Sequence, residues 1–167
     1  MRTIIDMNHQ MVKVTSTFDD FTRNLEVALG RLDPTIIQKV GAEPAFVEAH
    51  LKQMGGEEDL ILFDIQNHGQ LLTILGTPKK AKQYVVGNPL IAIKMTQHDI
   101  RAALYAPLRV LVYEAADQSV YVEYDLPSSL FGQFGNAEVT KVAKSLDLKL
   151  VNLIAKVDKF NLSQSTK

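Results

Sequence analysis

The chain has 167 residues, of which 46% are hydrophobic and 22% are charged, so it resembles one globular domain and not a disordered chain. Lys and Arg number 18 and Asp and Glu 19, so the net charge of −1 provides no strong attraction to nucleic acid or an anionic membrane. Cysteine is absent, which excludes disulfides, thiolate metal sites and cysteine nucleophiles. We see no signal peptide and no apolar run of the ~18 residues that a membrane span needs, so we expect a cytoplasmic protein.

The first part of the chain predicts a strand and two helices. Residues 11–15 alternate and are rich in β-formers, which predicts a strand. Thr17 has an acidic residue three positions later, which is typical of a helix N-terminus, and the apolar face of this helix extends to Leu32. Asp33–Pro34 ends it, and residues 44–54 form a second, shorter helix.

The middle of the chain contains one segment with two interpretations. Residues 60–65 are compact and mostly apolar, which predicts an interior strand. Residues 66–76 then form either a hairpin turn with a returning strand, or a short helix over 68–75 followed by a strand over 80–86.

The sequence Gly87-Asn88-Pro89 predicts a junction between a strand and a helix. Asn88 is a good N-cap and Pro89 has the fixed φ of a first helical residue. The helix extends to about Leu104, and Thr96 and Asp99 have the spacing of a second cap that would break it.

The last part of the chain predicts a hairpin and a long helix. Residues 108–113 and 119–124 alternate on either side of a short turn. Residues 127–134 are an irregular or briefly helical link, and Asn136 caps an amphipathic helix that reaches Val157.

This order, β-α-(α)-β-(α)-β-α-β-β-α, predicts an α+β fold with a mainly antiparallel sheet and helices on one face. We expect one domain over residues 1–160 and a flexible tail over 161–167. Residues 33–58 are an insertion or an extra helix.

Several motifs occur in an order that resembles a known family. His68 lies one strand before Gly87-Asn88-Pro89, a helical interval leads to Pro107-Leu108-Arg109, and the hairpin ends in Tyr124-Asp125-Leu126-Pro127. With the final helix, residues 60–157 resemble domain-of-unknown-function family 302 in its proteobacterial-type form. The resemblance implies a compact α+β unit that pairs as a homodimer, favours a helix over 68–75, and makes residues 44–54 an insertion. The family has no established activity.

Six side chains are candidates for a ligand site. Arg109 and Tyr113 share one strand face by alternation, whereas Tyr124 lies on the facing strand. The predicted apolar helix that contains Met95 lies beside the polar candidates His68, Asn88 and Arg109. A mostly apolar pocket with a few polar anchors is the usual chemistry of a ligand site.

Other chemistry has little support in the sequence. The four histidines have no metal-ligand spacing, so we expect no metal. There is no nucleophile elbow or dinucleotide fingerprint, so we expect no cofactor, and the basic footprint of a nucleic-acid binder is missing.

The sequence therefore predicts a non-catalytic homodimeric domain that binds a small apolar or amphipathic ligand. The candidate ligand-binding residues are His68, Asn88, Met95, Arg109, Tyr113 and Tyr124. One alternative is a small hydrolase or isomerase with His68 as base and Arg109 binding an anionic group. A second is a protein–protein interaction module that dimerises through an apolar patch on the last helix.

Overall fold

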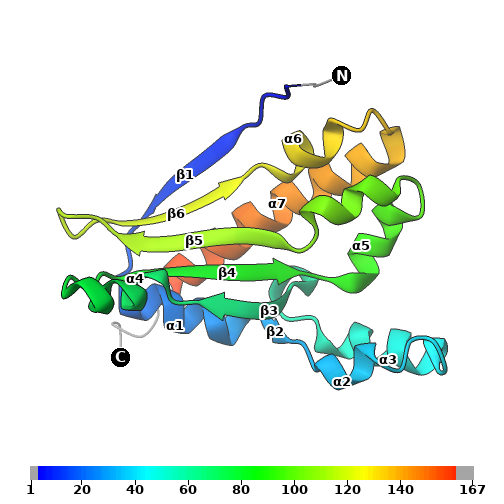
Figure 1. The fold of residues 1–167 in the computed structure, drawn as a ribbon, viewed down its shortest axis with the longest axis horizontal. Helices are drawn as coiled ribbons and strands as arrows, with labels where there is room; N and C mark the ends of the chain where they lie inside the picture. The colour runs from blue at the N-terminus through cyan, green and yellow to red at the C-terminus, as the bar shows by residue number, and fades with distance from the viewer. Residues whose placement is uncertain (1–3, 161–167) are drawn as a thin grey trace.

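The computed structural model describes residues 4–160, so the predicted tail over 161–167 lies outside the described residues. A six-stranded sheet with the order β1-β6-β5-β4-β3-β2 organises the molecule (Figure 1). Every neighbouring pair is antiparallel except β2 and β3. The strands are β1 His9–Val14, β2 Gly30–Arg31, β3 Ile61–Gln66, β4 Ala81–Gly87, β5 Leu108–Glu114 and β6 Val120–Asp125.

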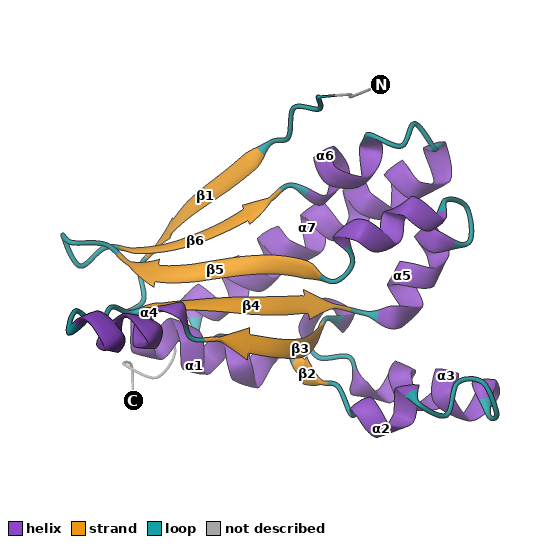
Figure 2. Ribbon diagram, in the orientation of Figure 1, coloured by secondary structure: helices purple, strands orange, loops and turns teal. Residues whose placement is uncertain are grey.

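Helices connect the strands and cover one face of the sheet (Figure 2). The α-helices are α1 Phe18–Ala28, α2 Pro34–Ile37, α3 Pro44–Met54, α4 His68–Leu71, α5 Pro89–Thr96, α6 Pro127–Gly132 and α7 Ala137–Lys159. The 3₁₀ helices are η1 Glu57–Asp59, η2 Leu72–Leu75 and η3 Ile100–Tyr105. Within residues 4–160, no helix combines the length and the apolar character that crossing a bilayer requires.

The main core lies between the sheet and the helices α1 and α7, which are behind the sheet in Figure 1. Phe21 of α1, Val112 of β5, Val122 of β6 and Val157 of α7 are all fully buried there. Alternate residues of each strand supply this core, because successive side chains point to opposite faces. The α+β class with a mainly antiparallel sheet, predicted from the sequence, is therefore confirmed.

Most predicted elements are present near their expected positions. The ambiguous segment is helical, as α4 followed by η2, and β4 follows it. The cap of α1 is also present, since the Asp20 N–H donates to the Thr17 hydroxyl. Asn136 caps α7 by accepting from the N–H groups of Glu138 and Val139.

The first helix is shorter than predicted. Its apolar periodicity continues to Leu32, but α1 ends at Ala28 and Leu29 is already extended. The Gly30 N–H then donates to the Leu60 carbonyl at 3.0 Å, and the Leu32 N–H donates to the Leu62 carbonyl at 3.3 Å. Pairing with β3 therefore overrides the local helical pattern and creates β2.

Pro34 begins a helix as well as following one. Asp33 caps α2 by accepting from the Thr35 N–H at 2.9 Å, and Pro34 occupies the first turn. Together α2 and α3 form a small lobe beside the end of the sheet, with its own cluster of Ile36, Val47 and Leu51 (Figure 1).

The helical segment after Gly87 breaks where the sequence predicts a break. The helix α5 ends at Thr96, and η3 begins after Asp99, which accepts from the Arg101 N–H at 3.0 Å. The Thr96 hydroxyl donates to the Ala92 carbonyl inside α5, so Asp99 and not Thr96 is the cap of the second helix.

Candidate functional site

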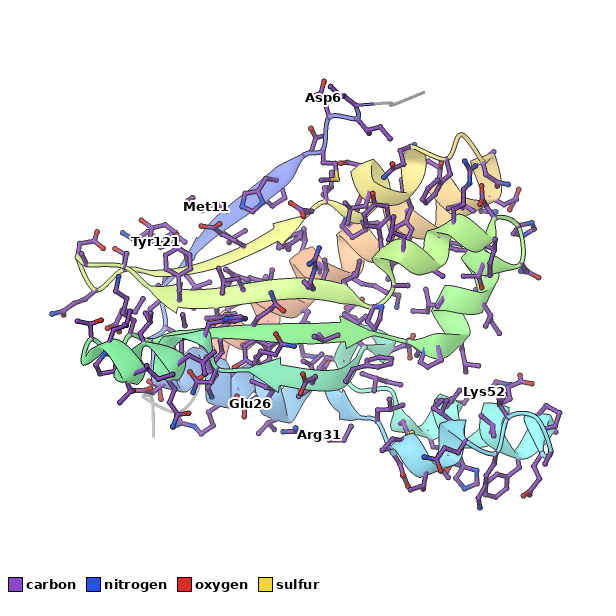
Figure 3. The ribbon with its side chains drawn as sticks, viewed as in Figure 1. Asp6, Met11, Glu26, Arg31, Lys52 and Tyr121 are labelled. Atoms are coloured by element: carbon purple, nitrogen blue, oxygen red, sulfur yellow. The ribbon has the colours of Figure 1, made fainter. Side chains whose placement is uncertain are left out.

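The face of the sheet opposite α1 and α7 presents an ordered array of side chains, which we call the open face. Strand register arranges it in rows that cross the strands. The rows are His9, Asp125, Arg109, Val85 and Asp64; then Met11, Glu123, Leu111, Gln83 and Gln66; then Lys13, Tyr121, Tyr113 and Ala81. Figure 3 views the molecule from this side, with Met11 and Tyr121 labelled. An antiparallel sheet tolerates such a polar, solvated face.

A hydrogen-bonded network joins β1, β6 and β5 on this face. The two ring nitrogens of His9 lie 3.0 Å from an Asp125 oxygen and 2.9 Å from a Glu123 oxygen. The Tyr113 hydroxyl donates to the other Glu123 oxygen at 2.6 Å, and the Tyr113 ring stacks on Tyr121 with centroids 5.6 Å apart.

The network shifts the pKa values of its members. The hydrogen bonds to Asp125 and Glu123 raise the pKa of His9 above its ordinary 6.5. The hydrogen bond from Tyr113, followed by that from His9, lowers the pKa of Glu123, and the bond to Glu123 raises the pKa of Tyr113 to about 12. When the imidazole is protonated, both of its nitrogens donate to carboxylates, so the arrangement stabilises an ion pair.

A groove of about 610 Å³ lies on the open face where β4 and β5 approach η3, and we call it the polar groove. Its floor includes Gln66, Gln83, Arg109 and Asp125, and Leu104 and Tyr105 of η3 border it. Arg109 is exposed, and its guanidinium makes no ion pair or hydrogen bond with any residue in the range 4–160.

A second, smaller space lies at the carboxyl end of β4, beneath α5, and we call it the apolar cavity. Its volume is about 160 Å³, and its walls include Phe63, Gly87, Ile91, Met95, Pro107 and Phe131. Gly87 helps to leave this space open, since a Cβ there would lie 3.3 Å from the Cβ of Pro107 and 3.7 Å from the Phe63 ring. Residues 106–108 line both the apolar cavity and the polar groove, so the two spaces share a wall.

Three of the six predicted site residues gather around this shared wall. Met95 is 1% exposed and lines the apolar cavity. Asn88 lies at its edge, but its side chain accepts from the Leu90 N–H and donates to the Asp59 carbonyl at 2.7 Å, so both ends are engaged structurally. Arg109 lies in the polar groove.

The other three predicted residues lie elsewhere. Tyr113 is on the open face but bonds to Glu123. Tyr124 is buried on the opposite face, where burial raises its pKa, with a further contribution from Asp147.

His68 is exposed at the start of α4, which packs at the beginning of β4, where the Lys79 N–H donates to the Gly69 carbonyl. Arg109 pairs with Val85, four residues beyond Ala81 in β4. At about 3.3 Å per residue, Ala81 and Val85 are roughly 13 Å apart along the strand. His68 is not among the residues that line the polar groove around Arg109.

Sequence reasoning missed the network around His9. The alternation in β6 already places Glu123 beside Tyr121, but the partner strand on that side is β1, more than one hundred residues away in the chain. Only that pairing brings His9 to the two carboxylates. Within residues 4–160, no set of three or more histidine or acidic side chains is arranged to hold a metal ion.

Comparison with known proteins fits this architecture. The family described as "Domain of unknown function DUF302" matches residues 36–157, which is more than half of the chain. The chain belongs to the DUF302 family. A crystal structure of an uncharacterized conserved DUF302 protein from Bacillus stearothermophilus has the same fold, with a TM-score of 0.65 and 16% sequence identity. The similarity covers 91% of this chain and 99% of that one. No functionally curated protein matches the chain.

Proposed function

We propose that this DUF302 protein is a non-catalytic, homodimeric domain that binds a small apolar or amphipathic molecule in the apolar cavity. The observation that carries the proposal is the cavity of about 160 Å³, whose walls are almost entirely hydrocarbon. An engineered apolar cavity of about 150 Å³ in another protein stays dry and binds benzene, so a space of this size suits a phenyl-sized group. The wall that it shares with the polar groove suits a ligand with one polar end.

The side-chain arrangement gives less support to a hydrolase or isomerase. That alternative requires His68 and Arg109 to act on one substrate, yet His68 does not line the groove that contains Arg109. His9, the histidine with acidic partners, has both ring nitrogens in hydrogen bonds with carboxylates, and these bonds favour its charged form.

Exposed apolar side chains support the homodimer. Three of them, Leu71, Ile74 and Leu75, are 61%, 85% and 74% exposed and form one apolar tip over α4 and η2. The apolar stripe of α7, which the sequence suggested as a dimer patch, is instead buried in the core, and residues such as Leu146 and Leu153 are 3% and 2% exposed. We therefore assign the contact with the second copy to the α4–η2 tip.

Native mass spectrometry of the purified full chain tests the proposed function. We expect a dimer with extra mass that denaturation releases as a small organic molecule. Ala92 lines the apolar cavity, so Ala92→Phe should fill it and remove the extra mass, whereas Ala155→Phe on the exposed side of α7 should retain it. Wild-type dimer at bare polypeptide mass, with no small apolar molecule taken up on addition, would contradict the binding proposal, and a monomer would contradict the homodimer.

A further inference from the structure

We infer that the ligand carries a single carboxylate, which Arg109 binds in the polar groove while the apolar part of the ligand occupies the apolar cavity. This inference rests on the proposed function, since it identifies the chemical class of the molecule that the cavity holds. Four observations carry it: the unpaired guanidinium, the groups around it, the shared wall and the size of the cavity.

Arg109 is an unused anion receptor. Its neighbour across the β5–β6 ladder is Asp125, because the register that pairs Leu111 with Glu123 continues two residues further. Asp125 bonds to His9 at 3.0 Å instead, and the Arg109 guanidinium has no partner within residues 4–160. Its five N–H donors, in a planar fork, match the two oxygens of a carboxylate.

The surroundings of Arg109 favour a monoanion over a dianion. Gln66 and Gln83 line the same groove and offer amide donors to an anionic group. Asp125 also lines it, so the groove already holds one carboxylate beside one guanidinium, and a dianionic phosphate would leave more uncompensated negative charge there than a carboxylate with one charge. A neutral ligand would leave the guanidinium unpaired.

The polar groove and the apolar cavity are next to each other along the chain. Arg109 follows directly after residues 106–108, which form the wall between the groove and the cavity. From Pro107 to Arg109 a strand advances about 7 Å. We place the ligand across this wall, with a phenyl-sized group in the cavity, a carboxylate at Arg109 and a linker of a few carbon atoms between them. The class of ligand is an aryl or short alkyl carboxylic acid.

Isothermal titration calorimetry with matched probes tests this inference on the full chain. The probes are 3-phenylpropanoate, the neutral 3-phenylpropan-1-ol and the dianionic 3-phenylpropyl phosphate. We expect the acid to bind wild-type protein at least about tenfold more tightly than the alcohol, which is the size of a charge-assisted hydrogen bond. We also expect the acid to bind more tightly than the phosphate ester.

Variants separate the head group from the apolar part. Arg109→Gln should weaken binding of the acid about tenfold or more and leave binding of the alcohol unchanged. Lys13→Gln, which removes an exposed cation from the same face at β1, should change neither affinity. Ala92→Phe should abolish binding of both probes by filling the cavity.

The outcomes distinguish the two proposals. Equal affinity for acid and alcohol, unchanged in Arg109→Gln, would overturn the carboxylate assignment and leave the proposed binding function intact. Tighter binding of the phosphate ester than of the acid would overturn the assignment of a single charge. Binding of none of the three probes to wild-type protein would count against the proposed function itself.

Discussion

The buried hydroxyl of Tyr84 links the sheet to the helix α1 through a hydrogen bond. Tyr84 lies in β4 and is 0% exposed, and its hydroxyl donates to a Glu26 oxygen of α1 at 2.9 Å. Lys82 donates to the same oxygen at 3.0 Å. Burial, followed by the bond to Glu26, raises the pKa of Tyr84 well above its ordinary 10.0, so the hydroxyl remains a donor throughout the physiological range.

Replacing this residue should lower stability without changing the fold. Tyr84→Phe removes one hydrogen bond to a charged group and leaves Glu26 paired with Lys82, so we expect a loss of about 1.5 kcal/mol in the free energy of unfolding. Urea denaturation measures it. Tyr121→Phe is the control, because that hydroxyl has no hydrogen bond within residues 4–160. Equal stability of the Tyr84→Phe variant and the wild type would show that the bond contributes nothing net.

The His9 ion pairs should make stability depend on pH in a defined direction. The pKa of His9 is raised from 6.5 in the folded protein, so the contribution is fully present below about pH 6.5 and is lost as the pH rises through the folded pKa. Glu123 behaves in the opposite way, and its contribution is present above its ordinary pKa of 4.5 and is lost on acidification through its lowered value.

We therefore expect His9→Gln to reduce the free energy of unfolding at pH 6 and to have almost no effect at pH 9. The His9 side chain is 52% exposed, so the loss at pH 6 should not exceed about 1 kcal/mol. Urea denaturation at both pH values measures the difference, with the exposed His98→Gln as control. An equal effect at the two pH values would assign the role of His9 to packing and not to charge.

At the level of single residues, the sequence identified the side chains that local chemistry positions. The caps Thr17, Asn88 and Asn136 all have the predicted role, since each depends on neighbours two or three residues away. Strand alternation also placed Arg109 and Tyr113 on one face correctly. It could not show that Tyr113 bonds to Glu123 or that His68 lies outside the groove of Arg109, because both depend on strand pairing.

At the level of elements, the short strand β2 depends on a close backbone approach. A Cβ on Gly30 would lie 1.7 Å from the Met54 carbonyl oxygen and 2.8 Å from the Gly56 nitrogen. The end of α3 and the start of β2 therefore meet at a contact that admits no side chain. This contact attaches the α2–α3 lobe to the edge of the sheet, next to β3.

Gly30→Ala should destabilise the protein strongly. The backbone of one segment must move to admit a methyl group, so we expect a loss of about 2–3 kcal/mol in the free energy of unfolding. Gly41→Ala is a matched control in the same lobe, because a Cβ there meets nothing within 4 Å. Thermal denaturation of both variants checks this, and a Gly30→Ala variant as stable as Gly41→Ala would rule out the close contact.

The elements β2 and α2 were not predicted, for the same reason. The helix expected to reach Leu32 gives way to β2, and the proline expected only to end a helix also begins α2. In each case the local sequence pattern is helical or helix-ending as predicted, but contacts with Leu60, Leu62 and the α3 cluster determine the secondary structure that forms. Periodicity does not report such long-range pairing.

At the level of the whole molecule, the α+β class and the family followed from the sequence, whereas the site did not. The strand order β1-β6-β5-β4 creates the open face, and it pairs β1 with β6, a strand more than one hundred residues later in the chain. The apolar cavity and the polar groove meet at residues 106–108, where the ends of β4, β5 and η3 converge. Of the predicted ligand-binding residues, Met95 and Arg109 lie on the two sides of this meeting point.

Because Met95 lines the apolar cavity, its methyl group can report occupancy directly. The chain has five methionines, and Met11 on the open face is 60% exposed and serves as an internal reference. In protein labelled with ¹³C-methyl methionine, NMR during titration with 3-phenylpropanoate should show a saturable shift of the Met95 methyl resonance. The Met11 resonance should stay in place, and Ala92→Phe should abolish the Met95 shift. A Met95 methyl resonance that does not move at high probe concentration would contradict the claim that the apolar cavity is a ligand site.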